Sequence, residues 1–542
     1  MPPSTASWLA PRKSEAKAIR FCDGCTAILI CLMVVFAPWA FGTTQTWSIW
    51  TMNIAGYALG VILIAKKAVQ QQTGYQPPRW DIRSESDDAE LFQVSYARPD
   101  PWSIALGILT FLVLAYTLVS ALNARATYIP WQRRFDYHDC IRWLPHSYDR
   151  VSTWNAFWNY LGLACFFWAA RDWLLGKSAR ERMKRPSQSA VAAQEISSKP
   201  WFSSREPSVE PAVLATPLPA IDPVSEQDPL PARLRLLLWV LCLNGSLLAF
   251  EAILQRLSGT NKLLWLVVPR FNQEAVNQFG PYAYRANAAS FFNLIWPVCL
   301  GWWIILRRHA VAASRTGHRA GSGSYLILLP GAVLMAACPI ISSNRGGALI
   351  AGGLIGVSVI LLWRMARHES LWFRLGTVSL FGIILAFGAA LGWDQLVPRF
   401  QTLFTDQMSR RAEIHLNALP IARDFPVFGT GPGTFGSLYH LYRKDVNQDW
   451  AAYVHDDWLE TRITFGWVGF ILILLMLGAV AWRWNIGPGL PVPLEFIVLV
   501  GTALGGVLLH AKFDFPFQIY SIHFLAVLLS AVLFCLARPP AT

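Results

Sequence analysis

The run TFGWVGFILILLMLGAVAW, residues 464–482, contains no charged side chain and decides the fold class. A helix of about 20 apolar residues crosses a hydrocarbon core roughly 30 Å thick. Similar apolar runs recur along the chain, and lipid-embedded backbone must satisfy its own hydrogen bonds. The sequence therefore predicts an all-α polytopic membrane protein with about twelve transmembrane helices. The expected spans are 24–41, 47–65, 102–122, 154–175, 235–256, 287–306, 325–342, 347–363, 375–392, 464–482, 494–511 and 518–536.

Composition supports this class. The 542 residues are 54% hydrophobic and only 15% charged, whereas soluble domains carry roughly 25% charged residues. The net charge of +13 is compatible with nucleic-acid binding. No basic helix or aromatic platform accompanies the charge, however, and its placement in short loops is typical of a topology signal. We therefore expect no nucleic-acid partner.

Lysine and arginine in short loops predict the orientation of the helices. If twelve spans alternate, these cations fall on one side of the membrane, which predicts cytoplasmic termini and an extracytoplasmic loop at 393–462. Residues 1–20 are too polar for a cleavable signal. The cations are Arg12, Lys13, Lys17, Arg20, Lys66, Lys67, Arg307, Arg308, Arg315, Arg319, Arg364, Arg367 and Arg374.

Three regions are expected along the chain. Residues 1–176 form a four-helix membrane region, and 234–542 form a second membrane region that contains the large loop. Residues 177–233 are rich in Ser, Pro and Ala and lack apolar periodicity, so they predict a disordered cytoplasmic linker. Cys22 and Cys25 have redox or metal spacing, but a lone pair at a helix end is a weak signal. Cys140 alone falls in an outer loop, so no disulfide framework is expected.

Three shorter outer loops also carry arginines: 123–153, 257–286, which ends in Arg285 and Asn287 at the mouth of a helix, and the turn at 342–347. Residues 123–153 are rich in Arg, Tyr and Trp, and their aromatic side chains suit anchoring at the membrane interface. The tight turn at 342–347 places Arg345 between two apolar helices. Such an arginine is costly unless it snorkels to lipid headgroups or meets an anion. Gly346, Gly347 and the following helix N-terminus make a phosphate ligand the second interpretation.

The large outer loop begins with a predicted amphipathic helix. Ser409 suits its N-cap, and Arg411 and His415 are four residues apart, so they share a face. The glycine pattern that follows lacks a strand–helix context, which argues against a dinucleotide fold. We expect these glycines to let the backbone pass close to a helix or a ligand. They are Gly429, Gly431 and Gly433.

Histidine and carboxylates gather near the end of this loop at His455, Asp456 and Asp457. A solvated polar cluster and a metal site are both open interpretations. Hard cations usually require more oxygen ligands than two adjacent carboxylates supply. A general base is favoured, because histidine side chains titrate near neutral pH and a neighbouring carboxylate can orient the ring.

The order of these motifs resembles the O-antigen ligase family over roughly residues 235–536. The residues that carry the resemblance are Arg285 and Asn287 with Pro297; Ser343, Arg345 and Gly346; Arg411, Pro426, Gly429, Gly431, Gly433 and Phe435; His455, Asp457, Leu459, Phe465 and Gly466; and His510, Asp514 and Pro516. The chain departs from the family pattern at Tyr453, where a second histidine is common. It also departs at Asp456, where asparagine is common, and at Thr464, where glutamate often stands.

The resemblance implies a GT-C-like bundle in a bacterial plasma membrane. It also implies glycan transfer from a polyprenyl-diphosphate-linked donor to a hydroxyl acceptor on a glycan, glycolipid or protein, with inversion and without a metal or another cofactor. His455 would be the base, oriented by Asp456 or Asp457. Arginines would bind the donor diphosphate, with Arg345 and Arg411 ahead of Arg285 and Arg410. Asn287, Gly429, Gly431, Gly433 and Asp514 would support the site.

Other activities remain open from the sequence. A polymerase of lipid-linked repeat units and a protein O-oligosaccharyltransferase share the same chemistry and differ in acceptor. A polysaccharide or lipid transporter is the alternative from another class. Transporters usually carry ionisable groups near mid-membrane, whereas Glu251 is the main charge within these spans and lies toward an outer end.

Overall fold

A computed structural model describes residues 13–75, 77–81, 100–178, 181, 230–315, 323–365, parts of 375–390, 407–445, 448 and 450–538. The helices are α1 (Lys13–Trp39), α2 (Thr46–Thr73), α3 (Pro101–Leu122), α4 (Arg150–Leu175), α7 (Ala232–Ser258), α8 (Arg285–Arg315), α9 (Leu328–Ile341), α10 (Arg345–Met365), α12 (Gln407–Asp424), α13 (Phe435–Leu438), α14 (Asp457–Trp482), α15 (Leu494–His510) and α16 (Tyr520–Cys535). Short 3-10 turns lie at η2 (Phe41–Thr43), η3 (Ala275–Asn277), η4 (Gly323–Ile327), η7 (Tyr439–Tyr442), η8 (Arg483–Asn485) and η9 (Pro516–Gln518). Two small strand pairs join β1 (Ala126–Ile129) to β2 (Arg134–Tyr137), antiparallel, and β3 (Leu490–Pro491) to β4 (Leu536–Ala537), parallel.

The helical membrane class expected from the apolar runs is confirmed. Seven described helices are long and apolar enough to cross a membrane: α1, α2, α3, α7, α8, α10 and α14. Every expected span except 375–392 coincides with a described helix. Residues 375–392 are only partly described, so the number of spans stays a prediction. Most of the expected linker, residues 182–229, also lies outside the described residues.

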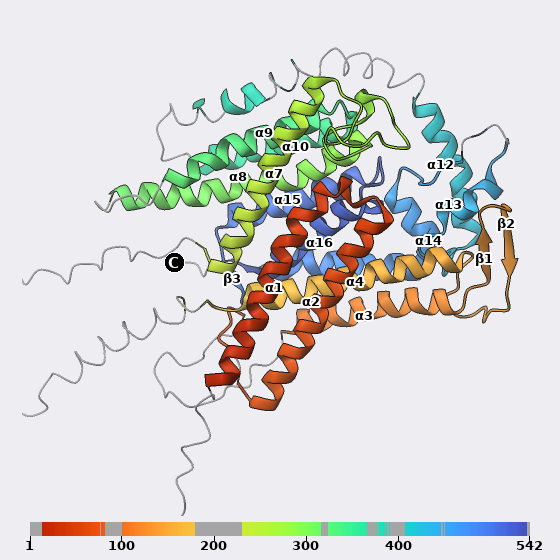
Figure 1. Ribbon diagram of the computed structural model, residues 1–542, viewed down its shortest axis with the longest axis horizontal. Helices are drawn as coiled ribbons and strands as arrows, with labels where there is room; N and C mark the ends of the chain where they lie inside the picture. The colour runs from red at the N-terminus through yellow and green to blue at the C-terminus, as the bar shows by residue number, and fades with distance from the viewer. Residues whose placement is uncertain are drawn as a thin grey trace, which may run out of the picture.

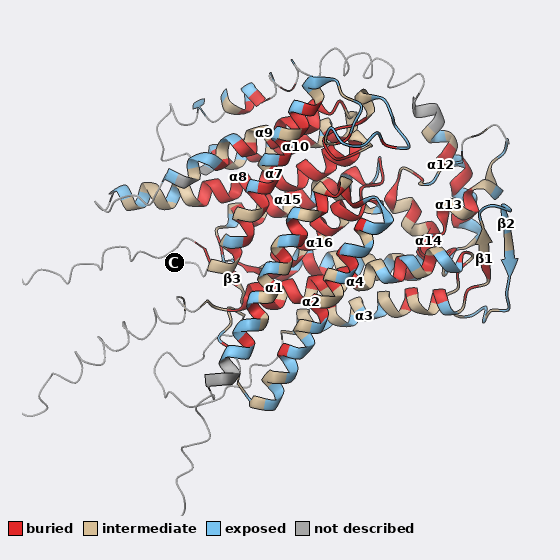
Figure 2. Ribbon diagram, in the orientation of Figure 1, coloured by how far each residue is buried: buried red, intermediate tan, exposed pale blue. Residues whose placement is uncertain are grey.

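The helices pack into one bundle (Figure 1). Helices α2 and α3 pack on α4, α3 packs on α14, and α8 lies between α9 and α15. The buried core is continuous between the helices before and after the linker, as Figure 2 shows. For example, the ring of Phe166 on α4 lies 4.5 Å from that of Phe524 on α16. The two expected membrane regions therefore share a single core.

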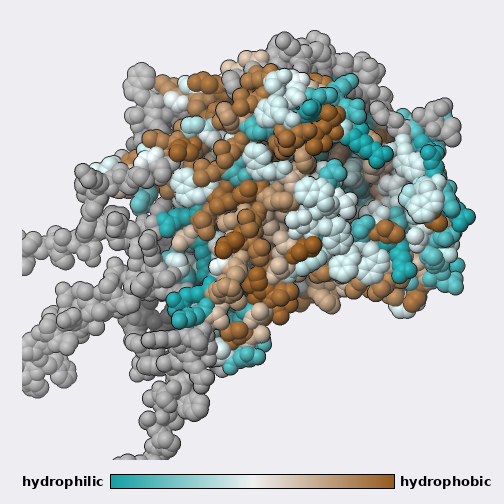
Figure 3. Space-filling view, viewed as in Figure 1, coloured by the Kyte–Doolittle hydropathy of each residue, from teal (hydrophilic) through white to brown (hydrophobic). Residues whose placement is uncertain are grey.

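Large apolar side chains also cover the outside of the bundle. Ile64, Phe111 and Leu247 are each more than half exposed. Figure 3 shows hydrophobic residues over the middle of the bundle and hydrophilic residues toward its two ends. Because lipid tails solvate apolar side chains, such a surface suits a bilayer and not water.

The two ends of the bundle differ in chemistry. One end, here named the loop end, carries α12, α13 and the β1–β2 hairpin (Figure 1). The opposite end holds buried ion pairs that join four helices. Lys66 Nζ lies 2.5 Å from Asp23 and 2.7 Å from Asp172, and Arg233 lies 2.6 Å from Asp23. These ion pairs connect α1, α2, α4 and α7. Each of these buried charges has a partner of opposite sign, which offsets the cost of removing it from water.

Two expected boundaries at the loop end were wrong. Helix α12 begins at Gln407, so Ser409 lies inside its first turn and not at the N-cap. Pro420 lies within α12 without ending it. Helix α14 begins at Asp457, so the last residues of the expected loop are already helical. Polar residues at 456–462 concealed that start, because helix caps and first turns are themselves polar.

Candidate active site

His455 lies at the loop end, two residues before α14 begins at Asp457. Its backbone is left-handed, with φ near +60°, which is uncommon for a residue that carries a side chain. Its Nδ1 lies 3.2 Å from Oδ1 of Asp514, and the imidazole is about one-quarter exposed. The contact of Nδ1 with a carboxylate leaves Nε2 as the second ring nitrogen available to a ligand.

Asp514 joins His455 to Arg411. Arg411 Nη2 lies 3.5 Å from Oδ2 of Asp514 and donates at 3.1 Å to the hydroxyl of Tyr284, while its Nη1 donates at 2.7 Å to the Phe513 carbonyl. The Tyr284 hydroxyl donates to the same Asp514 oxygen at 3.2 Å. A single buried carboxylate thus positions the histidine and one predicted donor-binding arginine.

The electrostatics of this cluster follow from burial and charge. Burial alone raises the pKa of a carboxyl, but the hydrogen bond with His455 and the charge of Arg411 outweigh it. The pKa of Asp514 is therefore held below its ordinary value. Burial, followed by the charge of Asp514, raises the pKa of Tyr284, so its hydroxyl stays protonated and can donate. Asp514 is ionised at neutral pH as a result.

Asp456 and Asp457 do not contact the imidazole as expected. Asp456 Oδ1 accepts from the Leu459 N–H at 3.1 Å, which caps α14, and its Oδ2 pairs with Lys512. Asp457 accepts from the Phe517 N–H at 2.8 Å and from Gln518 at 3.1 Å. The orienting contact expected of these two residues is made by Asp514 instead. Asp456 thus caps α14 directly after the histidine, and Asp457 joins the start of α14 to the 517–518 segment.

Glu460 completes that support. Its carboxylate accepts from the Val454 N–H at 2.9 Å, and the side chain is buried. The residues on both sides of His455 are thereby tied to the first turns of α14, which maintains its left-handed backbone. Such local strain persists only where surrounding contacts determine it, and it is common at functional sites.

The turn that carries Arg345 is built by close packing. Asn344 Oδ1 accepts from the Gly347 N–H at 2.6 Å and caps α10. A Cβ at Gly347 would collide with Ala289 on α8, so this position requires glycine. The turn places Arg345 near enough to Arg411 for their charges to interact. The structure therefore brings these two arginines to the same region.

The other predicted site residues take different positions. Arg285 Nη1 donates at 2.9 Å to the Val276 carbonyl in the preceding loop. Asn287 is buried two residues into α8. The Arg410 side chain lies outside the described residues. The charge of Arg411 acts on Arg345, and the charges of Arg411 and Arg285 both act on the Tyr284 hydroxyl.

The glycine-rich segment passes against a break in α14. Gly466 has φ +61° and ψ −168°, which interrupts the helix and frees backbone groups. Thr430 and Gly431 donate to the freed carbonyls of Ile463 and Thr464 at 2.9 and 3.0 Å. On the other side of the break, Trp467 and Val468 donate to the carbonyls at 426 and 427 at 2.9 and 3.2 Å.

Close approach explains two of these glycines. A Cβ at Gly429 would lie 2.5 Å from the Gly466 nitrogen, and one at Gly431 would lie 2.6 Å from Ser147 Oγ. All three predicted glycines, including Gly433, have positive φ. The segment thus supplies the hydrogen bonds that broken backbone requires inside a membrane protein.

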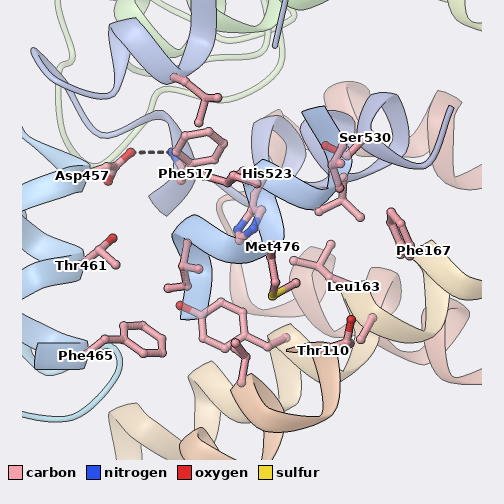
Figure 4. Close-up of a pocket in the computed structure, with 18 of the residues that line it drawn as sticks. Thr110, Leu163, Phe167, Asp457, Thr461, Phe465, Met476, Phe517, His523 and Ser530 are labelled. Carbon is pink, nitrogen blue, oxygen red and sulfur yellow. Dashed lines mark hydrogen bonds between the residues drawn. The ribbon is translucent and has the colours of Figure 1, made fainter. Parts of the chain in front are cut away.

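An apolar cavity of about 280 Å³ lies beside the histidine loop. It is lined by α3, α4, α14, α15 and α16, and it extends along α14 from Asp457 to Val480. Figure 4 shows Asp457 and Thr461 at one side of it, with His523, Met476, Leu163 and Phe167 around it. The cavity is therefore lined mainly by apolar side chains and runs from the loop end into the membrane-spanning part of α14.

Sequence reasoning missed three contributors to this site. These are Tyr284, Lys512 and Glu460. The sequence motifs predicted no function for any of them. Their contacts join segments far apart in the chain, which spacing alone does not reveal. Among the described residues, no group of three or more His, Cys, Asp or Glu side chains is arranged to hold a metal ion.

Comparison with known families identifies the central part of the chain. Residues 330–474 match the family model described as O-antigen ligase. The matched segment includes Arg345, Arg411 and His455. No curated protein matches the chain. This similarity of residues 330–474 to the O-antigen ligase family supports the resemblance seen in the motifs.

Proposed function

We propose that this protein transfers a glycan from a polyprenyl-diphosphate-linked donor to a hydroxyl acceptor at the outer surface of a bacterial plasma membrane. The observation that carries the proposal is the position of Asp514, which contacts both His455 and Arg411. A base and an anion-binding group are thereby held side by side. O-antigen ligase-type glycosyltransferases act on lipid-linked glycans, and this pairing suits their reaction.

His455 is the proposed general base. Asp514 accepts from Nδ1–H, which leaves the lone pair on Nε2 and stabilises the imidazolium that forms. The acceptor oxygen attacks the anomeric carbon while its proton passes to Nε2. The bond between the anomeric carbon and the diphosphate oxygen breaks, and its electron pair leaves with the diphosphate. Direct attack inverts the anomeric configuration.

Arg345 and Arg411 are the proposed diphosphate ligands. Negative charge grows on the leaving group as the glycosidic bond breaks, and fixed cations stabilise it. Two arginines whose charges repel each other are stabilised by an anion bound between them. Arg285 adjoins the same region through the 275–277 turn and is a third candidate.

The apolar cavity offers a place for a hydrocarbon chain of a lipid substrate. It begins at Asp457, two residues after the proposed base, and continues along the membrane-spanning part of α14. A lipid chain bound there would enter from the bilayer, while its headgroup remained at the loop end. This arrangement keeps the reacting groups in water and the chain in an apolar environment.

A reconstituted assay tests the function. The purified protein is incubated with a lipid-diphosphate-linked oligosaccharide and three acceptors: lipid A-core, a second lipid-linked repeat unit and a peptide. The expected result is a new glycosidic bond on one of them, and that acceptor separates ligase, polymerase and protein transferase. Movement of the donor across a vesicle membrane without transfer would contradict the proposal.

Substitutions test the assigned roles. His455→Ala should abolish transfer without preventing donor binding, whereas His138→Ala on the exposed hairpin should leave transfer unchanged. Arg345→Ala and Arg411→Ala should each raise the donor KM. Arg411→Lys should recover activity only in part, because lysine keeps the charge but loses the fork geometry. Full turnover in His455→Ala, or unchanged donor use in both arginine variants, would contradict these roles.

A further inference from the structure

Helix α12 carries a second polar group on the face that holds Arg411. His415 lies four residues after Arg411, so about one helical turn separates the two side chains. Arg411 donates to the Phe513 carbonyl, which holds this face of α12 against the 512–514 segment. His415 is partly exposed, and it makes none of the described contacts that hold Arg411 or orient His455. The donor site therefore does not account for it.

An ion pair lies directly after the proposed base, beside this face of α12. Asp456 follows His455, and its buried carboxylate pairs with the ammonium of Lys512. The Lys512 side chain is 55% exposed. An ammonium has three N–H donors. Beyond the one that pairs with Asp456, two of them can therefore bind solvent or a ligand.

Electrostatics place His415 beside this ion pair and beside the base. Burial has the largest effect on the pKa of His415 and lowers it. The carboxylate of Asp456 raises this pKa, while the charge of Lys512 lowers it, as do those of His455 and Arg411. The ring is therefore mainly neutral at neutral pH, with one N–H donor and one acceptor nitrogen. Among the described residues none hydrogen-bonds to this ring, so it can bind a ligand.

Two groups of polar side chains thus border His455. The first, Asp514 and Arg411, belongs to the proposed donor site. The second consists of His415 and Lys512, which lie near Asp456. In a displacement with inversion, the attacking oxygen and the leaving group lie on opposite faces of the anomeric carbon. The acceptor therefore needs a binding surface that the diphosphate ligands do not occupy, and the second group provides one.

We propose that His415 and Lys512 bind the acceptor through hydroxyl groups next to the one that attacks. The assignment rests on the transfer to a hydroxyl acceptor proposed above. A sugar ring carries hydroxyls on neighbouring carbons, so one can reach Nε2 of His455 while another meets His415 or Lys512. The hydroxyl of a serine or threonine side chain has no such neighbour. The two residues therefore select a glycan acceptor over a peptide and take no part in bond breaking.

Acceptor kinetics test this assignment. Wild type is assayed with a lipid-diphosphate-linked oligosaccharide and with lipid A-core, a lipid-linked repeat unit or a peptide as acceptor, and it should use a glycan acceptor and not the peptide. His415→Ala should raise the KM for that glycan acceptor by about fivefold to tenfold, the effect of one lost hydrogen bond. The donor KM should stay unchanged. His415→Gln should recover part of the loss, because an amide also donates and accepts.

Two further variants complete the set. Lys512→Gln, whose amide can still donate to Asp456, should also raise the acceptor KM, because it has fewer donors for the sugar. Leu416→Ala is the matched control on the same helix. Leu416 is 60% exposed and has no proposed contact with a substrate, so both KM values should remain those of wild type.

A change in the acceptor gives a result that a purely structural function would not produce. A glycan acceptor that lacks the hydroxyl next to the attacking one should have a raised KM with wild type, and this increase should shrink in His415→Ala or in Lys512→Gln. The same increase in wild type and both variants would overturn the acceptor site and leave the transferase function intact. Transfer to the peptide in preference to both glycans would also overturn it. Failure of wild type to transfer to any acceptor would remove the proposed function, and the acceptor site with it.

Discussion

At the residue scale, Asp514 is the centre of the site. The sequence pattern predicted His455, Arg345 and Arg411, and the structure brings Asp514 into contact with two of these three. The orienting contact expected of Asp456 or Asp457 is made by Asp514 instead. Adjacent residues point in different directions: Asp456 caps α14, whereas Asp457 accepts from the Phe517 N–H and from the Gln518 side-chain amide. A contact across 59 positions cannot be inferred from local spacing.

Replacing Asp514 tests its function directly. Asp514→Asn keeps the size of the side chain but removes the charge that orients and stabilises the imidazole. We expect kcat to fall by about 10² to 10⁴, the usual contribution of acid–base catalysis. The donor KM should change less, because Arg411 is also held by the Phe513 carbonyl and Tyr284. Asp136→Asn, an exposed change on the hairpin, is the control. A variant with normal kcat and a raised KM would contradict the positioning role.

The lowered pKa of Asp514 also predicts a pH dependence of stability. A carboxyl whose folded pKa is depressed stabilises the protein above its unfolded value of 3.8, and this contribution is lost as pH falls through the folded pKa. The difference in Tm between wild type and Asp514→Asn should therefore be largest near neutral pH and shrink below about pH 4. Thermal unfolding in detergent measures it. A difference that stays constant or grows on acidification would contradict the assigned ionisation.

At the scale of elements, the apolar runs predicted the helices well, because a membrane span must be long, apolar and internally hydrogen-bonded. The same reasoning did not predict the break in α14. The run at 464–482 reads as one continuous helix, yet Gly466 interrupts it and 426–431 supplies the missing partners. A glycine in the sequence indicates that the backbone can adopt positive φ there. It does not indicate that residues 426–431 bind the backbone on both sides of the break.

The break gives a sharp stability prediction. A Cβ at Gly466 would collide with the Val427 carbonyl, and its backbone conformation is essentially restricted to glycine. Gly466→Ala should destabilise the protein by more than the roughly 1–3 kcal/mol of backbone strain alone. Gly478→Ala on the same helix meets nothing within 4 Å and should be neutral or stabilising by up to about 1 kcal/mol. Thermal stability in detergent compares them, and similar values would argue against the broken helix.

At the scale of the whole molecule, the bundle separates two kinds of charge. Buried ion pairs join α1, α2, α4 and α7 at one end, and Arg345, Arg411 and His455 gather at the other. The ion-pair end holds Lys66, one of the lysines from which the orientation was predicted. Its pairing with Asp23 and Asp172 shows that this lysine also has a structural function. Sidedness therefore needs a measurement of its own.

Native cysteines allow that measurement. Cys140 is a free cysteine between β2 and α4 at the loop end, whereas Cys22 and Cys25 lie on α1 toward the ion-pair end. If the loop end faces outward, a membrane-impermeant maleimide added to spheroplasts should label wild type but not Cys140→Ser. In permeabilised membranes, Cys140→Ser should then be labelled at the cysteines of α1. Labelling of Cys140→Ser in sealed spheroplasts as strong as that of labelled wild type would contradict this orientation. The proposed base and arginines would then face the cytoplasm, where acceptors displayed on the outer surface are out of reach.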